Sequence, residues 1–199
     1  MILSLDTSTQ RGSLALISGD RILHERNIDT PRGRGGALFC ALEELLGEAS
    51  EIRRVVVGVG PGSYNGIRSA IAVAWGIATA RKIPLVGISS LLGIAPGSYC
   101  AVGDARRGQY FFAHVSHGTF IVEPRLIPKD ELRSVLPQPA LLPVYASDQI
   151  DFLPGMIVRT PHAALLGLLA AHRPANQPQP LYLKPAYITA PKSETKRPN

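Results

Sequence analysis

A glycine-rich segment in the first half of the chain is the part of the sequence best suited to hold an anion. Residues 58–68 read Gly-Val-Gly-Pro-Gly-Ser-Tyr-Asn-Gly-Ile-Arg and lie between an apolar run and a predicted helix, where backbone N–H groups attract negative charge. The segment lacks the Gly-Lys-Ser/Thr ending of a Walker A loop, and Ser63 stands where a dinucleotide fingerprint needs its third glycine. Two interpretations remain open: an anion site that uses Gly62 and Ser63, and a tight strand-to-helix turn capped by Ser63 or Asn65.

A second polar cluster closes the first predicted strand. Asp6, Thr7 and Ser8 supply a carboxylate and two hydroxyls at the turn toward the next strand. In actin-like nucleotide binders an Asp at this place coordinates a metal through water, and neighbouring hydroxyl and amide groups hold phosphate. The turn chemistry of an Asx motif explains the same residues equally well. Contact with a nucleotide or anion is therefore one expectation for these three residues, and a structural turn is the other.

The basic residues point to a nucleic-acid partner only in part. The sequence has 21 Lys and Arg against 15 Asp and Glu, a net charge of +6. Residues 192–199 contribute +2 of this, from three basic residues and one acidic residue, and the remainder is scattered. Phosphate binding usually needs a concentrated basic face. Arg106 and Arg107, at a predicted strand-to-strand turn, are the candidate RNA contact, with solvated hairpin arginines as the alternative.

No residues assemble a catalytic or metal site by their spacing. His114 and His117 fall on a predicted strand and its turn, where their side chains point to opposite faces. The sequence has no His-Glu-x-x-His motif and no serine flanked as in a nucleophile elbow. Its two cysteines, Cys40 and Cys100, are too few for a disulfide framework or a structural zinc site, so we expect a reducing cytoplasm. We expect no signal peptide, and no membrane span, because no apolar stretch approaches the ~20 residues that one needs.

The predicted elements follow one order almost twice. The first half reads as a three-strand meander, helix, strand, helix and strand, with elements at 2–8, 12–18, 21–28, 37–49, 55–59, 65–81 and 84–88. The second half repeats this in shorter form, at 99–104, 109–115, 119–126, 129–136, 141–146, 156–159 and 161–172. The order predicts an α/β fold with duplicated ribonuclease-H-like lobes of the actin/sugar-kinase/Hsp70 type. We expect a first lobe over 1–98, a reduced second lobe over 99–190, and a disordered tail over 191–199.

The predicted helix over 65–81 is apolar on more than one side. Alanines and a glycine recur at every second position from Ala70 to Ala80, which predicts one nearly smooth side that another helix can approach closely. A second row runs through Ile67, Ile71, Trp75 and Ala78. Such a helix is either fully buried inside the fold or part of a subunit interface.

Five motifs in this order resemble the TsaB (YeaZ) family, and together they span most of the chain. The most specific is Gly60-Pro61-Gly62-Ser63. The others are Leu5-Asp6-Thr7-Ser8, Gly87-Ile88-Ser89-Ser90-Leu91, Asp104-Ala105-Arg106-Arg107 and Pro180-Leu181-Tyr182-Leu183-Lys184.

The resemblance implies a noncatalytic scaffold with no catalytic residue, metal or cofactor of its own. TsaB is a paralogue of TsaD. With TsaD and the ATPase TsaE it supports transfer of the threonylcarbamoyl group from threonylcarbamoyl-AMP, made by TsaC, to an adenosine beside the tRNA anticodon. ATP and a metal are used by the partner subunits, and the metal motif of TsaD, His-x-x-x-His, is absent from this sequence. The implied partners are TsaD in a heterodimer, TsaE, and tRNA through the complex, with Arg106 and Arg107 as its candidate contact.

The family pairs with TsaD through the two helices of its first lobe, and alone it can form a homodimer through the same surface. Carried onto this sequence, that implies an interface of Leu38, Leu42, Leu45, Tyr64, Ile67, Ile71, Ala74 and Trp75. The alternative for any of these that face inward is a place in the core. We therefore expect Ala74→Arg to block pairing with TsaD and to leave the monomer folded.

The sequence departs from the family pattern at three places. Gly33-Arg34-Gly35-Gly36 stands where the family commonly has a His-Ser pair, Tyr64-Asn65 replaces Phe-Thr, and Lys184 replaces an arginine.

The two rival functions are a phosphotransferase and a peptidase. A small actin-fold phosphotransferase would use Asp6 and the glycine-rich turn, but it needs a second phosphate loop that the sequence lacks. A peptidase would need a nucleophile–base pair or a metal motif, and neither is present.

Overall fold

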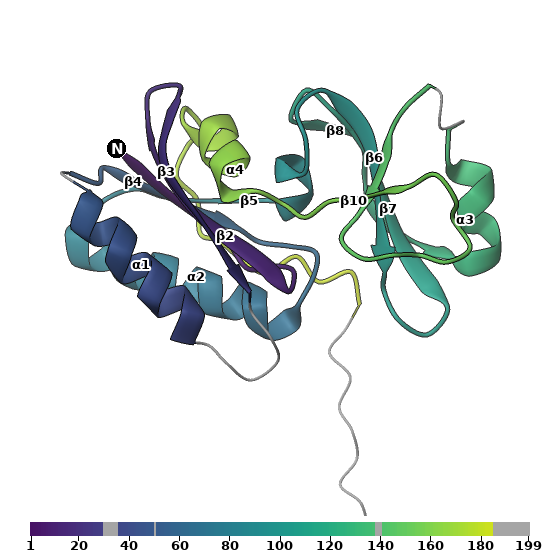
Figure 1. Ribbon diagram of the computed structural model, residues 1–199, viewed down its shortest axis with the longest axis horizontal. Coiled ribbons are helices and arrows are strands. Elements are labelled where there is room, and N and C mark those ends of the chain that lie inside the picture. The colour runs from purple at the N-terminus through teal and green to yellow at the C-terminus, as the bar shows by residue number, and fades with distance from the viewer. Residues whose placement is uncertain (30–35, 50, 138–140, 185–199) are drawn as a thin grey trace, which may run out of the picture.

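The first lobe is built on a five-stranded sheet whose strands are ordered β3-β2-β1-β4-β5. The computed structural model describes residues 1–29, 36–49, 51–137 and 141–184, and Figure 1 shows its two lobes side by side. The elements of the first lobe are β1 (Ile2–Asp6), β2 (Arg11–Ser18), β3 (Arg21–Asp29), α1 (Gly36–Glu48), β4 (Arg54–Gly58), α2 (Tyr64–Arg81), β5 (Leu85–Ile88) and the short 3-10 helix η1 (Ser90–Gly93).

The second lobe repeats the strand order of the first. Its sheet is ordered β10-β9-β6-β7-β8, again an antiparallel meander followed by two parallel strands. Its elements are β6 (Ser98–Asp104), β7 (Gln109–Ser116), β8 (Thr119–Pro128), α3 (Lys129–Val135), β9 (Val144–Ala146) and β10 (Ile157–Val158), followed by α4 (Ala163–Ala170). Where the first lobe has α2, the second has no helix between β9 and β10. The duplicated ribonuclease-H-like fold with a reduced second lobe, predicted from the sequence, is confirmed.

Continuous burial along the central strands β1 and β4 explains why both faces of the first sheet carry helices. In β1, Leu3 and Leu5 are fully buried in one core with α1 and α2. In β4, Val55 and Val57 join that core, whereas Val56 belongs to a core on the other face. Because successive side chains of a strand point to opposite faces, a run such as Val55–Val57 needs cover on both sides. Figure 1 shows α1 and α2 beneath the sheet and α4 above it.

The helix α4 belongs to the first sheet, although it follows the second lobe in the chain. Ala163 and Ala164 pack with Ala15 and Ile17 of β2, and the backbone N–H of Ala163 donates to Ser13 Oγ over 2.8 Å. The expected lobe over 99–190 therefore loses this helix to the first lobe. The physical reason is that this helix buries the apolar side chains of Ala15 and Ile17 on β2. The expected tail over 191–199 lies outside the described residues.

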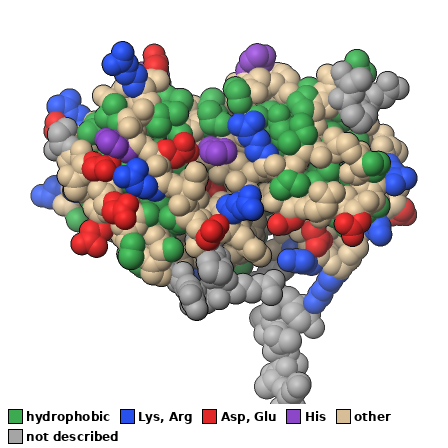
Figure 2. Space-filling view, in the orientation of Figure 1, with side chains coloured by type: hydrophobic (Ala, Val, Ile, Leu, Met, Phe, Trp, Pro, Cys, Tyr) green, Lys and Arg blue, Asp and Glu red, His purple; other side chains and the backbone are tan. Residues whose placement is uncertain are grey.

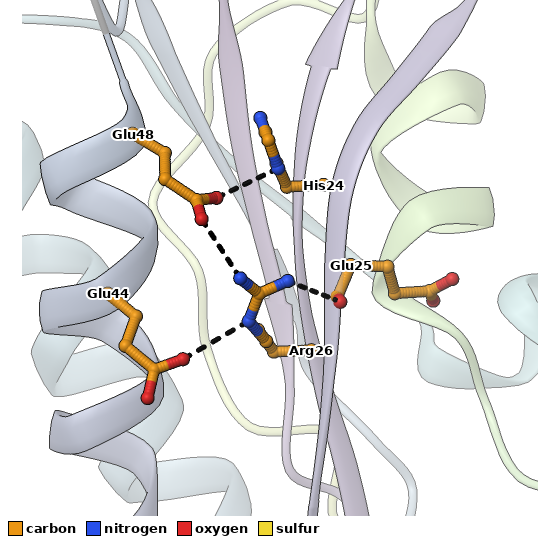
Figure 3. Close-up of polar contacts among 5 residues, drawn as sticks. All are labelled: His24, Glu25, Arg26, Glu44 and Glu48. Atoms are coloured by element: carbon orange, nitrogen blue, oxygen red, sulfur yellow. Dashed lines mark hydrogen bonds and ion pairs between the residues drawn. The ribbon is translucent and has the colours of Figure 1, made fainter.

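A group of charged side chains ties α1 to the edge strand β3 (Figure 3), and Figure 2 shows acidic, basic and histidine side chains gathered over this part of the first lobe. Arg26 donates through Nε to Glu44 over 3.1 Å and through Nη2 to Glu48 over 3.0 Å. His24 Nδ1 lies 2.8 Å from the same Glu48 carboxylate, and Arg26 also donates to the backbone carbonyl of Glu25. Exposed pairs stabilise a fold by well under ~1 kcal/mol each, so this group orients α1 more than it stabilises the lobe.

Across the described ranges, no helix is long and apolar enough to cross a membrane.

Candidate functional site

Asp6 lies at the end of β1 and is fully buried. Its Oδ1 accepts hydrogen bonds from the backbone N–H of Ser8 over 2.9 Å and from Ser8 Oγ over 2.7 Å. Its Oδ2 accepts one from Ser90 Oγ over 2.5 Å. Burial raises the pKa of this carboxyl above its usual range, and the hydrogen bonds from Ser90 and Ser8 oppose that shift in part. Both carboxyl oxygens are thus occupied by donors from the chain itself.

The glycine-rich turn packs directly on residues 6–8. A side chain at Gly58 would overlap Asp6 Oδ2, and one at Gly62 or Gly66 would run into the backbone carbonyl of Ser8 or Thr7. The backbone N–H of Ser63 donates to Ser8 O over 2.6 Å, and Thr7 Oγ1 donates to Gly66 O over 2.7 Å. These glycines therefore allow two segments of backbone to approach each other, and the space a phosphate would need is filled.

The structure thus gathers the five residues of the predicted anion site and gives them a packing role. Asp6, Thr7 and Ser8 are buried, and only Gly62 and Ser63 are exposed. Ser63 is the N-cap of α2, and its Oγ accepts from Gly66 N over 3.3 Å, as the turn interpretation predicted. For an Asp6-dependent phosphotransferase, this arrangement would have to open before any ligand could reach the carboxylate.

The outer side of α1 and α2 carries large exposed aromatic side chains. Phe39 on α1 is 60% exposed, and Tyr64 and Trp75 on α2 are 46% and 52% exposed. Arg68 and Ala72, also exposed, lie between the last two on one stripe, because positions 64, 68, 72 and 75 fall within about 80° of arc on a helix. We call Phe39, Tyr64, Arg68, Ala72 and Trp75 the aromatic face. Exposed aromatic groups of this size on the surface of a lobe indicate an interaction surface.

Five residues of the expected interface belong to the core instead. All five are at most 8% exposed: Leu38, Leu42, Leu45 and Ala74 pack in the core against the sheet, with Ile71 partly buried beside them, and Ile67 lies against Gly60 of the glycine-rich turn. The full burial of Ala74 argues against the expectation that Ala74→Arg leaves the monomer folded. The prediction of one smooth alanine side was wrong. Residues two apart on a helix lie about 200° apart, so Ala70, Ala74 and Ala78 face the sheet while Ala72, Gly76 and Ala80 face outward.

The sequence reasoning missed Phe39 and Tyr182. Phe39 had a usable signal, since it falls outside the inward stripe of Leu38, Ala41, Leu42 and Leu45. Tyr182 lies in the family-like motif 180–184, but its stacking on Tyr64, at a centroid distance of 5.1 Å, depends on the fold of the C-terminal segment.

Arg106 and Arg107 lie exposed on the turn between β6 and β7. Both adopt left-handed backbone angles, with φ of 66° and 56°. Asp104 holds the turn by accepting from the backbone N–H of Arg106 over 2.6 Å and from its Nη1 over 3.1 Å. Lys184 Nζ donates to the carbonyls of Ala105 and Arg106 over 2.9 and 2.8 Å. The turn is thus held from both sides, and it presents two cationic side chains to solvent.

The other reactive side chains do not converge. Within the described residues, no group of three or more His, Cys, Asp or Glu side chains is arranged to hold a metal ion. Burial raises the pKa of the Cys100 thiol to about 11, which makes it a poor nucleophile, and Cys40 is exposed on α1.

Comparisons with known proteins point to one family. Residues 36–123, which include α1 and α2, match the family model of TsaD, tRNA N6-adenosine threonylcarbamoyltransferase. The chain is 28% identical over 124 residues to the tRNA threonylcarbamoyladenosine biosynthesis protein TsaB of Escherichia coli, and 30% identical over 120 residues to that of Bacillus subtilis. These alignments cover 56% and 55% of this chain and about half of each relative, 53% and 52%. The solved structure of YeaZ from Pseudomonas aeruginosa superposes with a TM-score of 0.72 at 25% identity, covering 92% of this chain and 99% of that one.

Proposed function

Because the chain belongs to the TsaB/YeaZ family, we propose that it serves the biosynthesis of threonylcarbamoyladenosine in tRNA as a noncatalytic scaffold. In this role it binds a TsaD protein through the aromatic face, and it supports transfer of the threonylcarbamoyl group to the adenosine beside the anticodon. Its place of action is the cytoplasm.

The aromatic face is the observation that carries the proposal. Phe39, Tyr64 and Trp75 remain about half exposed or more, although the core beneath them is closely packed. Tyr, Trp and Arg are the residues most often found at the energetic centre of protein interfaces. Beside Trp75, the small residues Ala72 and Gly76 leave room for a partner helix to approach closely.

A TsaD partner fits this surface because TsaD is related to this chain over the same elements. The TsaD family model aligns with residues 36–123, so a TsaD protein carries its own counterpart of the α1 and α2 pair. Two related helix pairs can meet face to face about an approximate two-fold axis. The same geometry accounts for a homodimer when this chain is alone.

A noncatalytic role fits the closed cluster around Asp6. A catalytic or metal-binding carboxylate needs an open approach, whereas the Asp6 oxygens are held by Ser8 and Ser90 beneath the glycine-rich turn. The proposed chain therefore needs neither nucleotide nor metal of its own, and ATP and the metal act in the partner subunits. No feature of the site favours a phosphotransferase or a peptidase. TsaE and tRNA join through the complex, with Arg106 and Arg107 placed to contact tRNA phosphates.

The test compares exposed apolar residues on and off the aromatic face. Trp75→Glu and Phe39→Glu should abolish co-purification with TsaD and lower the yield of modified nucleoside in a reconstituted reaction with TsaC, TsaD, TsaE and tRNA. The matched control is Ile121→Glu on β8 of the second lobe, a residue that is 62% exposed and should tolerate the same charge. Circular dichroism and the melting temperature establish that each variant is folded. Full TsaD binding by folded Trp75→Glu and Phe39→Glu would refute the proposed surface.

A further inference from the structure

The C-terminal segment 173–184, which we call the strap, runs back along the edge of the first sheet without forming a strand. It follows α4, and Figure 1 shows it as the yellow-green trace that passes behind the sheet toward the second lobe. At its start, Arg54 Nη1 donates to the carbonyl of Arg173 over 2.6 Å. The backbone N–H of Asn176 then donates to Leu85 O over 3.0 Å, so the strap pairs with the edge strand β5.

Asn176 clamps the strap onto β5 through its side chain. Its Oδ1 accepts from the backbone N–H of Gly87 over 2.7 Å, and its Nδ2 donates to the carbonyl of the same residue over 3.0 Å. The amide group thus satisfies both backbone groups of Gly87, as a neighbouring strand would. Pro178 lies so close to Gly87 that a side chain there would meet it at 2.8 Å. Few conformations of the strap can satisfy all these contacts.

The far end of the strap has two anchors on either side of Tyr182. The backbone N–H of Leu181 donates to Val59 O in the first lobe over 2.8 Å. Lys184 Nζ donates to two carbonyls of the Ala105–Arg106 turn in the second lobe. Tyr182 is therefore held between the lobes, in a position that neither lobe would give it alone.

Tyr182 extends the aromatic face at its Tyr64 end. Its ring stacks on Tyr64 with an interplanar angle of 19°, and the Arg68 guanidinium lies 5.2 Å from the centre of the Tyr64 ring. Arg68 also donates to the Tyr64 hydroxyl over 3.1 Å. The pKa of Arg68 is raised, first by a hydrogen bond with Tyr182. After all these contacts, Tyr64 is still 46% and Tyr182 still 42% exposed, so the stack is not buried by its own chain.

We propose that the strap supplies Tyr182 to the partner surface, so that the TsaD-type partner contacts a composite surface of α2 and strap. The inference rests on the proposed function and names a further binding residue and the device that positions it. The occupant is a protein because the stack continues into Ala72 and Trp75, an apolar stripe with one cation, whereas an RNA backbone needs a basic groove. The partner should offer an apolar side chain to the two tyrosines and a carboxylate or carbonyl to Arg68.

Asn176 and Lys184 are positioning residues in this scheme. Neither belongs to the stack. Asn176 attaches the strap to β5 before Tyr182 in the chain, and Lys184 attaches it to the turn between β6 and β7 after Tyr182. Loss of either side chain should leave Tyr182 present but free to move. Its ordering on binding then costs conformational entropy, which weakens the affinity for the partner.

The experiment measures the affinity and rates of TsaD binding for strap variants of the full chain. Tyr182→Ala should weaken binding about tenfold, mostly through faster dissociation. Tyr182→Phe keeps the ring and should retain most of the affinity. Asn176→Ala and Lys184→Ala should weaken binding about threefold. The matched control is Gln179→Ala, an exposed residue of the same strap, which should change nothing.

The outcomes separate this inference from the proposed function. If Trp75→Glu loses TsaD and Tyr182→Ala binds like the wild type, the partner surface stands and the role of the strap is refuted. If both variants bind like the wild type, the proposed function itself fails. Equal affinity of Tyr182→Phe and Tyr182→Ala, both weakened, would refute stacking as the cause. Loss of tRNA binding by the isolated Tyr182→Ala chain, with normal TsaD affinity, would overturn the choice of a protein occupant.

Discussion

The hydroxyl of Ser90 donates a 2.5 Å hydrogen bond to Asp6 Oδ2, although 84 residues separate the two in the chain. The same Ser90 Oγ accepts from the backbone N–H of Gly60 over 2.9 Å. One serine thereby joins the end of β1, the glycine-rich turn and the start of η1. The carboxylate that would mark a nucleotide site in an actin-like enzyme is here the centre of a packed junction.

Removal of this junction should cost stability rather than a chemical activity. We expect Asp6→Ala to lower the free energy of unfolding by about 2–4 kcal/mol, because it leaves buried donors of Ser8 and Ser90 without an acceptor. Urea denaturation followed by fluorescence measures the change. Threonylcarbamoyl transfer by the assembled complex, assayed well below the melting temperature, should persist. Unchanged stability with complete loss of activity would contradict the structural role.

The buried Asp6 carboxyl should also leave a signature in the pH dependence of stability. Its pKa is raised by burial in the folded state. The folded state therefore binds the proton more tightly than the unfolded chain does. The resulting contribution to the free energy of unfolding is full below the unfolded pKa of about 3.9, and it is lost as pH rises through the pKa of the folded state. The free energy of unfolding of wild type minus that of Asp6→Asn should fall as pH rises from about 3.9. Urea titrations at a series of pH values test this, and a difference that grows with pH would show the opposite shift.

Two glycines of α2 should respond in opposite directions to the same substitution. A side chain at Gly66 would overlap the Thr7 carbonyl oxygen, whereas at Gly76 it would meet nothing within 4 Å. Gly66→Ala should destabilise the fold by about 3 kcal/mol or more, and Gly76→Ala should stabilise it by about 0.5–1 kcal/mol through helix propensity. Melting temperatures of the two variants decide the matter. Similar values for both would show that the turn moves away from residues 6–8 at little cost.

Neighbouring residues of α2 should separate folding from binding. Ala74 is fully buried against the sheet and Trp75 is 52% exposed. Ala74→Arg should destabilise the monomer by several kcal/mol, about 3 or more, because it places a charge and a long chain in a closed core. Trp75→Glu should change the melting temperature little and affect TsaD binding instead. Soluble expression, near-UV circular dichroism and urea unfolding of Ala74→Arg provide the check. A well-folded Ala74→Arg monomer would mean that α2 is turned differently about its axis.

The exposed turn arginines should contribute to tRNA binding through charge alone. Arg107→Ala should weaken tRNA binding by the complex, and it should reduce the slope of log affinity against log salt by about one. Deletion of residues 192–199, which carry a charge of +2, should reduce the slope further. Lys129→Ala on α3, another exposed cation of the second lobe, is the control for a general change in charge. An unchanged slope in the Arg107 variant would remove this turn from the tRNA contacts.

The order of elements and the family could be predicted from the sequence, because both depend on local patterns. Apolar alternation in residues 2–8 and the buried run at 55–59 indicate strands whatever surrounds them. The duplicated order follows from those elements, and the structure shows the same strand order in both sheets. The Gly-Pro-Gly-Ser segment could be recognised for the same reason, since a turn that must approach other backbone closely tolerates few residue types.

Which side of a helix faces the core was decided only by the tertiary structure. On α2, which is apolar on more than one side, periodicity alone does not separate Ala74 from Ala72. The sheet that covers the helix buries Ala74 in the core and leaves Ala72 exposed. The return of α4 to the first lobe and the stacking of Tyr182 on Tyr64 depend on contacts between distant parts of the chain. Local sequence determines elements because backbone and neighbouring side chains act over a few residues. Which side chains are buried and which stay exposed depends on which elements pack against each other, and that is a property of the whole fold.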